Sequence, residues 1–260
     1  MKDASREIRI MGILNLTPDS FYGPSRHRLA VLDEAPDIVD LGAVSTRPGA
    51  SEVSLEEEWS RLEPVLRLIS TEYRSLTVSV DTTRPTIVER ACDVLGRPII
   101  VNDISAGEDD PQMLSTVASL GLEYVAMHKR GTPATMQSLC SYDDVVEEVL
   151  SYFDGFAERA AQAGVSHWIL DPGFGFAKTA QQCFELFAAL PRFSGTERPV
   201  LVGISRKSFI YRTLGITPEE SLPATSALHL AALERGADIL RVHDVAEARR
   251  IVDLYRKLEA

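Results

Sequence analysis

Polar or charged side chains follow eight short apolar runs of this sequence, one group after each run. In chain order they are Asn15, Asp40, Asp81, Asn102, His128, Asp171, the triplet Ser205-Arg206-Lys207, and Arg241 with His243. Carboxylates and amides suit the donor and acceptor edge of a flat heterocycle. Arginine, lysine and histidine suit an anion. The side chains therefore indicate a site for a heterocyclic substrate that carries an anionic group.

The apolar runs have the length of buried strands. They are Arg9 to Leu14, Ile38-Val39, Thr77 to Val80, Ile99 to Val101, Glu123 to Met127, His167 to Leu170, Val200 to Ile204 and Asp238 to Val242. Eight strands that each end in a functional side chain are typical of a (β/α)8 TIM barrel, whose active site lies at the carboxyl ends of its strands. The length of 260 residues is usual for one such barrel. We therefore predict an α/β fold, a single barrel domain over residues 1–260.

Helical patterns lie between the predicted strands, as parallel crossovers require. A capping box begins at Ser54, and Pro64 inside the following pattern predicts a kink or a break. Pro85 suits the first position of another helix. Further helices are predicted over 143–164 and from Asp244 onward, where Asp244 is the expected cap.

Composition and charge limit the classes of partner. The net charge of −11 argues against nucleic acid and against an anionic membrane surface. Three widely spaced cysteines form no metal or redox motif and are expected to be reduced. The sequence shows no signal peptide and no apolar run near the ~20 residues of a membrane span. We therefore expect a cytoplasmic protein that acts on small molecules.

Seven motifs occupy the predicted strand ends. They are 11–21, 40–42 with 45–50, 79–82, 101–104, 171–178, 203–208 and 241–245, and they include Asp171-Pro172-Gly173-Phe174-Gly175-Phe176-Ala177-Lys178 and Ser205-Arg206-Lys207-Ser208. In this order they resemble the dihydropteroate synthases, the folate-pathway enzymes that sulfonamides inhibit. The resemblance extends from about Ile10 to Val245.

The resemblance implies a reaction and a set of pterin contacts. The family joins 6-hydroxymethyl-7,8-dihydropterin pyrophosphate to p-aminobenzoate, which gives 7,8-dihydropteroate and pyrophosphate. Asp171 matches the carboxylate that accepts the amino group and the ring N–H of the pterin together. Asn102 matches the amide that contacts another part of the pterin edge, and Lys207 matches the lysine that donates to its carbonyl. Met127 is expected to pack on the ring, and Asp81 to lie beside it.

The resemblance also implies an anion site and a metal. Asn15, Arg47, Arg241 and His243 match the pyrophosphate contacts of the family, and Asn15 matches the residue that helps to hold Mg²⁺. Because one amide is a small contribution to metal binding, Mg²⁺ is expected to arrive with the pyrophosphate. The implied mechanism is a dissociative substitution. Pyrophosphate leaves with help from the three basic residues, and Asp81 stabilises the pterin cation that remains.

The family binds p-aminobenzoate in a slot between the second, sixth and seventh loops. The matching residues are Thr46, Arg47, Pro48, Phe174, Ser205 and Lys207, and Phe21 is a candidate to close over them. The family places the donor to the p-aminobenzoate carboxylate at the start of the helix in the seventh loop. Ser205 and its neighbouring amides are the residues expected there. The family also leads us to expect a homodimer.

Structural explanations exist for several of these residues. Asp81 or Asp171 could cap the helix that follows, and Asp-Pro-Gly could be only a turn. His128 and Asp40 fit a structural role as well as a functional one. Two other functions are open: a non-catalytic pterin-binding homologue that supports a partner synthase, and a methyltetrahydrofolate-dependent methyltransferase acting with a corrinoid protein. A leaving-group site with Arg241 and His243 is of use to neither.

The sequence departs from the family pattern in two places. Many members have Gly-Gly-Glu before Ser-Thr-Arg, where this chain has Gly42-Ala43-Val44. The stretch from Phe21 to Asp40 is shorter than usual and leaves room for only two or three helical turns. Because the first loop covers the active site in this family, the shortening is expected to act on p-aminobenzoate affinity more than on pterin binding.

Overall fold

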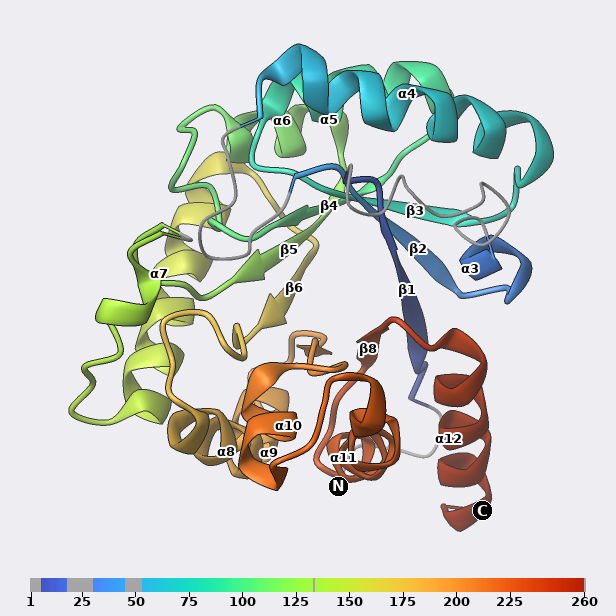
Figure 1. The fold of residues 1–260 in the computed structure, drawn as a ribbon. Coiled ribbons are helices and arrows are strands. Elements are labelled where there is room, and N and C mark those ends of the chain that lie inside the picture. Colours follow the sequence, from blue (N-terminus) through green and yellow to red (C-terminus); the bar gives the residue numbers. More distant parts are fainter. Residues whose placement is uncertain (1–5, 18–29, 45–52, 133, 260) are drawn as a thin grey trace.

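The computed structural model describes residues 6–17, 30–44, 53–132 and 134–259. Its strands lie at the centre, and its helices surround them (Figure 1). The strands are β1 (Arg9–Asn15), β2 (Ile38–Gly42), β3 (Thr77–Asp81), β4 (Ile100–Asp103), β5 (Glu123–Met127), β6 (Trp168–Asp171), β7 (Leu201–Val202) and β8 (Ile239–Val242). They pair in parallel in the order β6-β5-β4-β3-β2-β1-β8-β7. A single bridge between Leu170 and Val200 joins β6 to the start of β7 and closes the barrel. The predicted (β/α)8 fold is confirmed.

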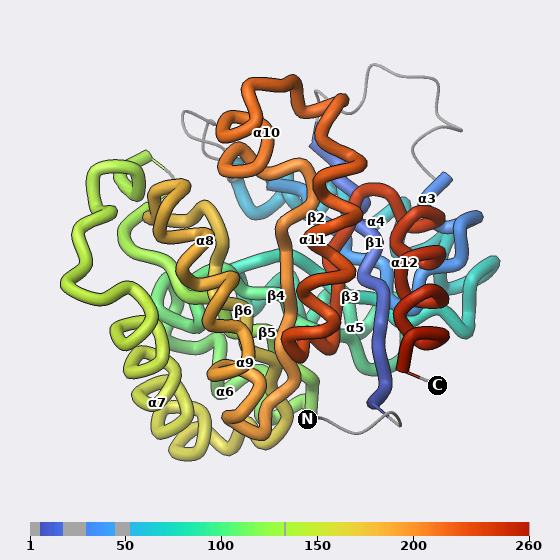
Figure 2. Tube along the Cα trace, turned by 90° about the horizontal axis from the view of Figure 1, so that it is seen from below, coloured from blue at the N-terminus to red at the C-terminus, as the bar shows by residue number. Residues whose placement is uncertain are grey.

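Helices follow the strands around the barrel. They are α3 (Ala30–Asp33), α4 (Leu55–Glu72), α5 (Pro85–Leu95), α6 (Met113–Leu120), α7 (Val145–Ala163), α8 (Ala180–Ala188), α9 (Leu190–Ser194), α10 (Ser208–Leu214), α11 (Leu222–Glu234) and α12 (Val245–Leu258), with 3₁₀ turns at Met136–Ser138 and Glu219–Ser221. Figure 2 shows β1 rising toward the end of the molecule at which α10 lies. That end carries the carboxyl ends of the strands. Among the described residues, no helix combines the length and the apolar composition needed to cross a membrane.

Several helix boundaries agree with their sequence signals. The Ser54 side chain accepts a hydrogen bond from the amide of Glu57 at 3.2 Å, and Pro85 lies in the first turn of α5. Gly164 ends α7 in the left-handed conformation. Of the kink or break predicted at Pro64, the break is wrong, because α4 continues through it. Its buried face of Leu62, Leu66 and Ile69 holds the helix together despite the lost hydrogen bond.

Asp244 stands at the predicted start of α12, but its side chain is not the cap. Both carboxylate oxygens of Asp244 accept hydrogen bonds from Arg206, at 2.7 and 2.9 Å, and its side chain does not cap α12. A carboxylate from a distant segment does this instead, because Glu34 accepts from the amide of Ala246 at 2.9 Å. The ion pair between Arg206 and Asp244 therefore joins the loop after β7 to the loop after β8.

Two strands differ from the predicted runs in a way that matters for the site. β7 is reduced to two residues, and β2 continues past Asp40 to Gly42. Asp40 therefore lies inside a strand instead of at its end, and its side chain is 0% exposed. A carboxylate in such a place needs partners from neighbouring strands.

The interior of the barrel is apolar in its middle. An inner apolar layer consists of Met11, Ile38, Ile100, Val125, Ile169, Leu201 and Ile239. Toward the amino ends of the strands, Arg9 of β1 and Glu123 of β5 form two hydrogen bonds of 3.1 Å across the barrel. A separate and larger core lies between the strands and the surrounding helices. Polar groups above the inner apolar layer are thus shielded from solvent on one side.

Candidate active site at the carboxyl ends of the strands

Strand alternation places the predicted site residues at one level of the barrel. Residues two apart on a strand face the same side of the sheet. Asp40, Asn102, Met127, Asp171 and Arg241 each follow a member of the inner apolar layer by two residues, namely Ile38, Ile100, Val125, Ile169 and Ile239. Their side chains therefore form the next layer of the interior, toward the carboxyl ends.

Asp40 is the centre of this polar layer. Its Oδ1 accepts from the hydroxyl of Ser79 at 2.6 Å, and its Oδ2 accepts from Asn102 Nδ2 at 3.0 Å. Arg241 Nε donates to the same Oδ2 at 2.7 Å. The four residues come from β2, β3, β4 and β8, so the contacts cross the barrel. With Nδ2 used on Asp40, the orientation of the Asn102 amide is fixed and its oxygen is left as an acceptor.

Arg241 bridges two carboxylates. Besides Asp40, it donates through Nη2 to Asp81 Oδ2 at 2.9 Å. Burial lowers the pKa of Arg241, but Asp40 and Asp81 outweigh burial and raise the pKa above its usual value. For Asp81, burial raises the pKa to about 7, Arg241 opposes the rise and Asp40 adds to it. Asp81 is thus a carboxylate whose charge is poorly solvated and available to stabilise a nearby cation.

Asp171 and Lys207 lie together on the other side of the site. Asp171 Oδ1 accepts from the amide of Gly173 at 2.8 Å, and Lys207 donates to the carbonyl of Phe174. Burial raises the pKa of Asp171, and Lys207 opposes that rise. Burial lowers the pKa of Lys207 to about 8. One oxygen of Asp171 is thus occupied by its own turn, while Oδ2 has no hydrogen bond from the described residues.

Two glycines leave space among these side chains. A Cβ on Gly203 would lie 3.9 Å from both Asp171 Oδ2 and the Cβ of Arg241. A Cβ on Gly42 would lie 3.5 Å from Asn15 Oδ1 and 3.7 Å from Asp81 Oδ2. The amide of Asn15 and the carboxylate of Asp81 thus flank Gly42. With no side chain at either glycine, neither carboxylate is covered from that position.

His243 and Ser205 are partners across the loops after β7 and β8. Ser205 Oγ lies 3.1 Å from His243 Nδ1 and accepts from the His243 amide at 3.2 Å. The helix of the seventh loop, α10, begins only at Ser208, which is exposed. The expectation that Ser205 stands at the start of this helix is therefore wrong. Sequence could not place the helix start within Ser-Arg-Lys-Ser, because Ser205 and Ser208 are equally good capping residues.

The ring of Phe174 faces the core. Its side chain is 0% exposed and stacks on Phe209, with ring centroids 6.2 Å apart and an angle of 22°. The ring of Phe176, two residues further on, lies under the ammonium of Lys207, which is 4.9 Å from its centroid. The Phe174 ring therefore does not lie beside Lys207 as predicted, and the ring next to that ammonium is that of Phe176.

The second loop is described only at its two ends. The predicted residues Thr46, Arg47 and Pro48, and also Phe21 of the first loop, lie outside the described residues. At the near end, Arg61 of α4 donates to the carbonyl of Ala43 at 2.7 Å. At the far end, Arg84 donates to the carbonyl of Val53 at 2.6 Å.

A buried glutamate of α4 supports Arg84. Glu58 is 1% exposed, and it accepts from Arg84 at 2.7 Å and from the hydroxyl of Thr82 at 2.6 Å. Thr82 directly follows Asp81. The loop after β3 and the end of the second loop are therefore attached to the same helix.

Two buried charged residues beside the site had no settled role in the sequence analysis, Asp40 and Lys178. Asp40 fitted either role, and the structure makes it the partner of Arg241 and Asn102. Lys178 was part of a motif without a role, and it is 4% exposed and bonded to His128. The sequence shows only a lysine at the end of a Gly-rich loop, and this pattern is too common to predict that the lysine is buried.

Asn15 is the candidate donor to a metal ion among the predicted site residues. The described residues contain no group of three or more His, Cys, Asp or Glu side chains placed to hold a metal ion. Asn15, at the end of β1, is exposed and contributes one amide oxygen. An oxygen donor of this kind fits a hard cation that brings its other ligands with it.

Comparisons with known proteins agree with this geometry. Residues 11–243 match the family model described as pterin binding enzyme. The dihydropteroate synthase of Escherichia coli K12 is 40% identical over 258 residues, which cover 94% of this chain and 90% of that protein.

Two solved structures extend the likeness to the fold. Dihydropteroate synthase from Yersinia pestis, in complex with a sulfonamide drug, has a TM-score of 0.89 and 34% identity, with 98% of this chain and 95% of that chain covered. The Xanthomonas albilineans enzyme with 4-aminobenzoic acid has a TM-score of 0.88 and 36% identity, with 99% and 94% covered. The chain therefore belongs to the dihydropteroate synthase family of pterin-binding enzymes, which are transferases of folate biosynthesis.

Proposed function

We propose that the polar layer of this barrel binds a dihydropterin pyrophosphate and joins it to p-aminobenzoate. The observation that carries the proposal is the arrangement of Asp40, Arg241 and Asp81 opposite Asp171 and Lys207. Two of its carboxylates, Asp81 and Asp171, are suited to a heterocycle, and Arg241 is suited to a leaving anion. The relatives add support, because one structure holds 4-aminobenzoic acid and another a sulfonamide drug.

The pterin is proposed to lie between Asp171 and the Asn102 amide. Asp171 Oδ2 accepts from the amino group and the ring N–H, Lys207 donates to the carbonyl, and Asn102 accepts from a further N–H. Met127, 3% exposed at the end of β5, packs against the ring. Each of these hydrogen bonds is worth about 1–3 kcal/mol when its loss leaves a buried partner unpaired.

Bond breaking is proposed to precede bond formation. The C–O bond to pyrophosphate breaks, and the pair of electrons leaves with the pyrophosphate, whose charge Arg47, Arg241 and His243 stabilise. Asp81 stabilises the positive charge left on the pterin methylene group. The amine of p-aminobenzoate then forms the C–N bond and releases a proton.

The p-aminobenzoate is proposed to lie beside Lys207 and the ring of Phe176. Its carboxylate is placed at the start of α10, where Ser208 is the exposed hydroxyl, and Ser205 instead supports His243. Thr46, Arg47 and Pro48 complete the slot in this proposal, as the family pattern implies. The attachments of Ala43 and Val53 support it, because they hold both ends of the second loop near the site.

Mg²⁺ is proposed as a cofactor that Asn15 holds together with the pyrophosphate. When bound, it neutralises charge on the leaving group. The exposed amide oxygen of Asn15 fits an ion that arrives with its other ligands. We also propose that the chain is a single domain that works as a homodimer in the cytoplasm, as the family resemblance implies.

A turnover assay tests the function directly. With dihydropterin pyrophosphate, Mg²⁺ and p-aminobenzoate, the protein is expected to release pyrophosphate and to form the pteroate product in equal amounts. Omission of Mg²⁺ or addition of a sulfonamide is expected to stop both. Binding of the pterin pyrophosphate without product would favour a non-catalytic pterin-binding homologue instead.

The raised pKa of Asp81 predicts an acid limb in the pH profile. Only the ionised carboxylate stabilises the pterin cation, so kcat/KM for the pterin substrate is expected to fall about tenfold between pH 8 and pH 6 as Asp81 of the free enzyme takes up a proton near pH 7. The measurement is this ratio, because it reports the pKa values of the free enzyme. The residual activity of Asp81→Asn is expected to lack this limb, and a limb that persists in the variant would assign it to another group.

A further inference from the structure

Lys178 is a buried lysine beside the site that the proposed reaction does not use. It belongs to loop 6, which we define as residues 172–179 between β6 and α8. Its ammonium lies 2.8 Å from His128 Nδ1, 3.0 Å from the carbonyl of Phe176 and 3.1 Å from the carbonyl of Gly173. The His128 carbonyl is more distant, at 3.4 Å. An ammonium has three protons, and three acceptors lie at full hydrogen-bond distance.

All of these acceptors are uncharged. Among the described residues, no carboxylate forms an ion pair with Lys178. Burial lowers its pKa to about 7; Cys183 and Asp171 oppose the change, and Lys207 and Arg130 add to it. A buried ammonium with only neutral partners costs stability. Because Lys178 costs stability, its role is to be found in the groups that its hydrogen bonds hold in place.

His128 is arranged to receive this ammonium. Its ring is 3% exposed, and burial, with Lys178 and Arg130 adding to the effect, lowers its pKa to about 2. A neutral ring whose Nδ1 accepts from Lys178 carries its proton on Nε2, an assignment that follows from the partner. Tyr152 packs edge-on against the ring, with centroids 4.9 Å apart. The acceptor therefore has a fixed position at the end of β5.

The contacts of Lys178 converge on the peptide that orients Asp171. The Gly173 amide donates to Asp171 Oδ1, and the Gly173 carbonyl accepts from Lys178. Gly173 has a φ of +71°, and a Cβ there would lie 2.0 Å from the His128 carbonyl oxygen. Loop 6 therefore lies directly on the end of β5, and Lys178 joins the two. Lys207 holds the same loop from the site side through the Phe174 carbonyl.

We propose that Lys178 and His128 are positioning residues for pterin recognition. By tying the Gly173 and Phe176 carbonyls to the end of β5, the pair fixes the turn that directs the second oxygen of Asp171 toward the pterin. Neither side chain touches the substrate. The inference rests on the proposed pterin role of Asp171, and it adds that this role depends on loop 6 being fastened from behind.

Lys178→Met tests the proposal with calorimetry on two probes, 6-hydroxymethylpterin and inorganic pyrophosphate. The pterin Kd is expected to rise about 30-fold, the effect of misplacing one or two buried hydrogen bonds. The pyrophosphate Kd is expected to change less than about threefold, because the hydrogen bonds of Lys178 go to loop 6 and the end of β5. In turnover, the KM for the pterin substrate rises while kcat at saturation changes little. General damage to the fold would weaken both probes.

His128 variants give a second test that does not remove the lysine. In His128→Asn the amide oxygen lies close to the former Nδ1 and can accept from Lys178, so pterin affinity is expected to stay near the wild-type value. His128→Leu removes the acceptor and is expected to reproduce the effect of Lys178→Met. Rescue by asparagine alone would identify the hydrogen bond, and not the ring volume, as the cause.

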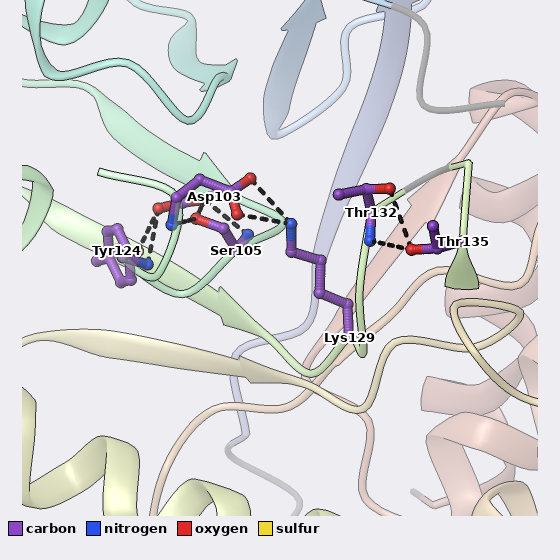
Figure 3. Close-up of polar contacts among 8 residues, drawn as sticks. Asp103, Ser105, Tyr124, Lys129, Thr132 and Thr135 are labelled. Carbon is purple, nitrogen blue, oxygen red and sulfur yellow. Dashed lines mark hydrogen bonds and ion pairs between the residues drawn. The ribbon is translucent and has the colours of Figure 1, made fainter. Parts of the chain in front are cut away.

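The neighbouring Lys129 provides a matched control. It is 8% exposed, and it pairs with Asp109 at 2.9 and 3.0 Å beside the cluster of Asp103, Ser105 and Tyr124 (Figure 3). Its ammonium is thus directed toward the loop after β4, and its two hydrogen bonds are not among those that the proposal uses. Lys129→Met removes a similarly buried lysine and is expected to leave pterin affinity unchanged.

The outcomes separate this inference from the proposed function. If the wild-type protein binds pterin and turns over while Lys178→Met and His128→Leu bind pterin equally well, the positioning role is refuted and the function stands. Equal weakening of pterin and pyrophosphate in these variants would also overturn it. If Lys178→Met does not fold, the contrast between His128→Asn and His128→Leu decides the question. Failure of the wild-type protein to bind pterin would refute the proposed function itself.

Discussion

Asp171→Asn is expected to weaken pterin binding by about 100-fold, since hydrogen bonds to a buried charged group are worth about 1.5–3 kcal/mol each. The oxygen of the new amide can still accept from the Gly173 amide at the position of Oδ1, so the turn is retained. The NH₂ group then takes the place of Oδ2 and faces the two N–H donors of the pterin. Because the NH₂ group and the pterin N–H groups are all donors, no hydrogen bond forms between them, and the binding energy of this edge of the pterin is lost.

Calorimetry with 6-hydroxymethylpterin measures the effect, and Asp103→Asn is its control. Asp103 is a buried aspartate at the end of the nearby strand β4, and it accepts from Tyr124, Ser105 and the Gly107 amide. These partners lie outside the polar layer. The control is expected to lose stability without losing pterin affinity. An unchanged pterin Kd in Asp171→Asn would remove Asp171 from its proposed role.

Arg241→Met is expected to lower both stability and activity, by separate causes. Removal of the guanidinium leaves Asp40 buried with an uncompensated charge, which costs about 3–5 kcal/mol and lowers the Tm by about 10 °C in a protein of this size. The same change removes a cation from the leaving-group site. Loss of a charge that acts in the transition state is expected to lower kcat by about 1,000-fold.

A double variant separates the two causes. In Asp40→Asn/Arg241→Met the charge of Asp40 is gone, the new amide oxygen still accepts from Ser79, and the Asn102 amide can turn to accept from the new NH₂ group. The charge of Asp81 remains, but its side chain is 19% exposed and can take up a proton near pH 7. Most of the lost Tm is therefore expected to return, while kcat stays as low as in the single variant. Calorimetric unfolding and pyrophosphate release measure the two quantities. Recovery of activity together with stability would mean that Arg241 serves only to neutralise Asp40.

Most of the fold could be predicted from local patterns. A buried parallel strand is a short apolar run, and the polar residue after it marks its carboxyl end, so eight such runs indicated the element order and the face that carries the site. The residues at which strands end were harder to predict from the sequence. β7 has only two residues, and the loop that follows it brings Lys207 to the carbonyl of Phe174, a contact between segments 33 positions apart in the sequence.

The types of the site residues could be predicted, but several of their positions could not. Phe174 and Phe176 are equivalent in sequence, and only the path of loop 6 decides which ring enters the core and which lies under Lys207. Ser205 and Ser208 are equally suited to a helix start, and contact with His243 decides the matter for Ser205. Asp244 has the sequence of a cap, but a guanidinium across the loops is a stronger partner than a backbone amide.

The sequence by itself determined the barrel, the end at which the chemistry lies, and a polar set suited to a heterocycle and an anion. These follow from periodicity and residue chemistry, which act over a few residues. Only the tertiary structure decided which charges neutralise one another. Arg241 and Asp40 are 201 positions apart and meet because β8 pairs with β1, beside β2. Lys178 meets His128 because β5 and β6 end side by side. Such contacts depend on the closure of the whole barrel, which no local pattern contains.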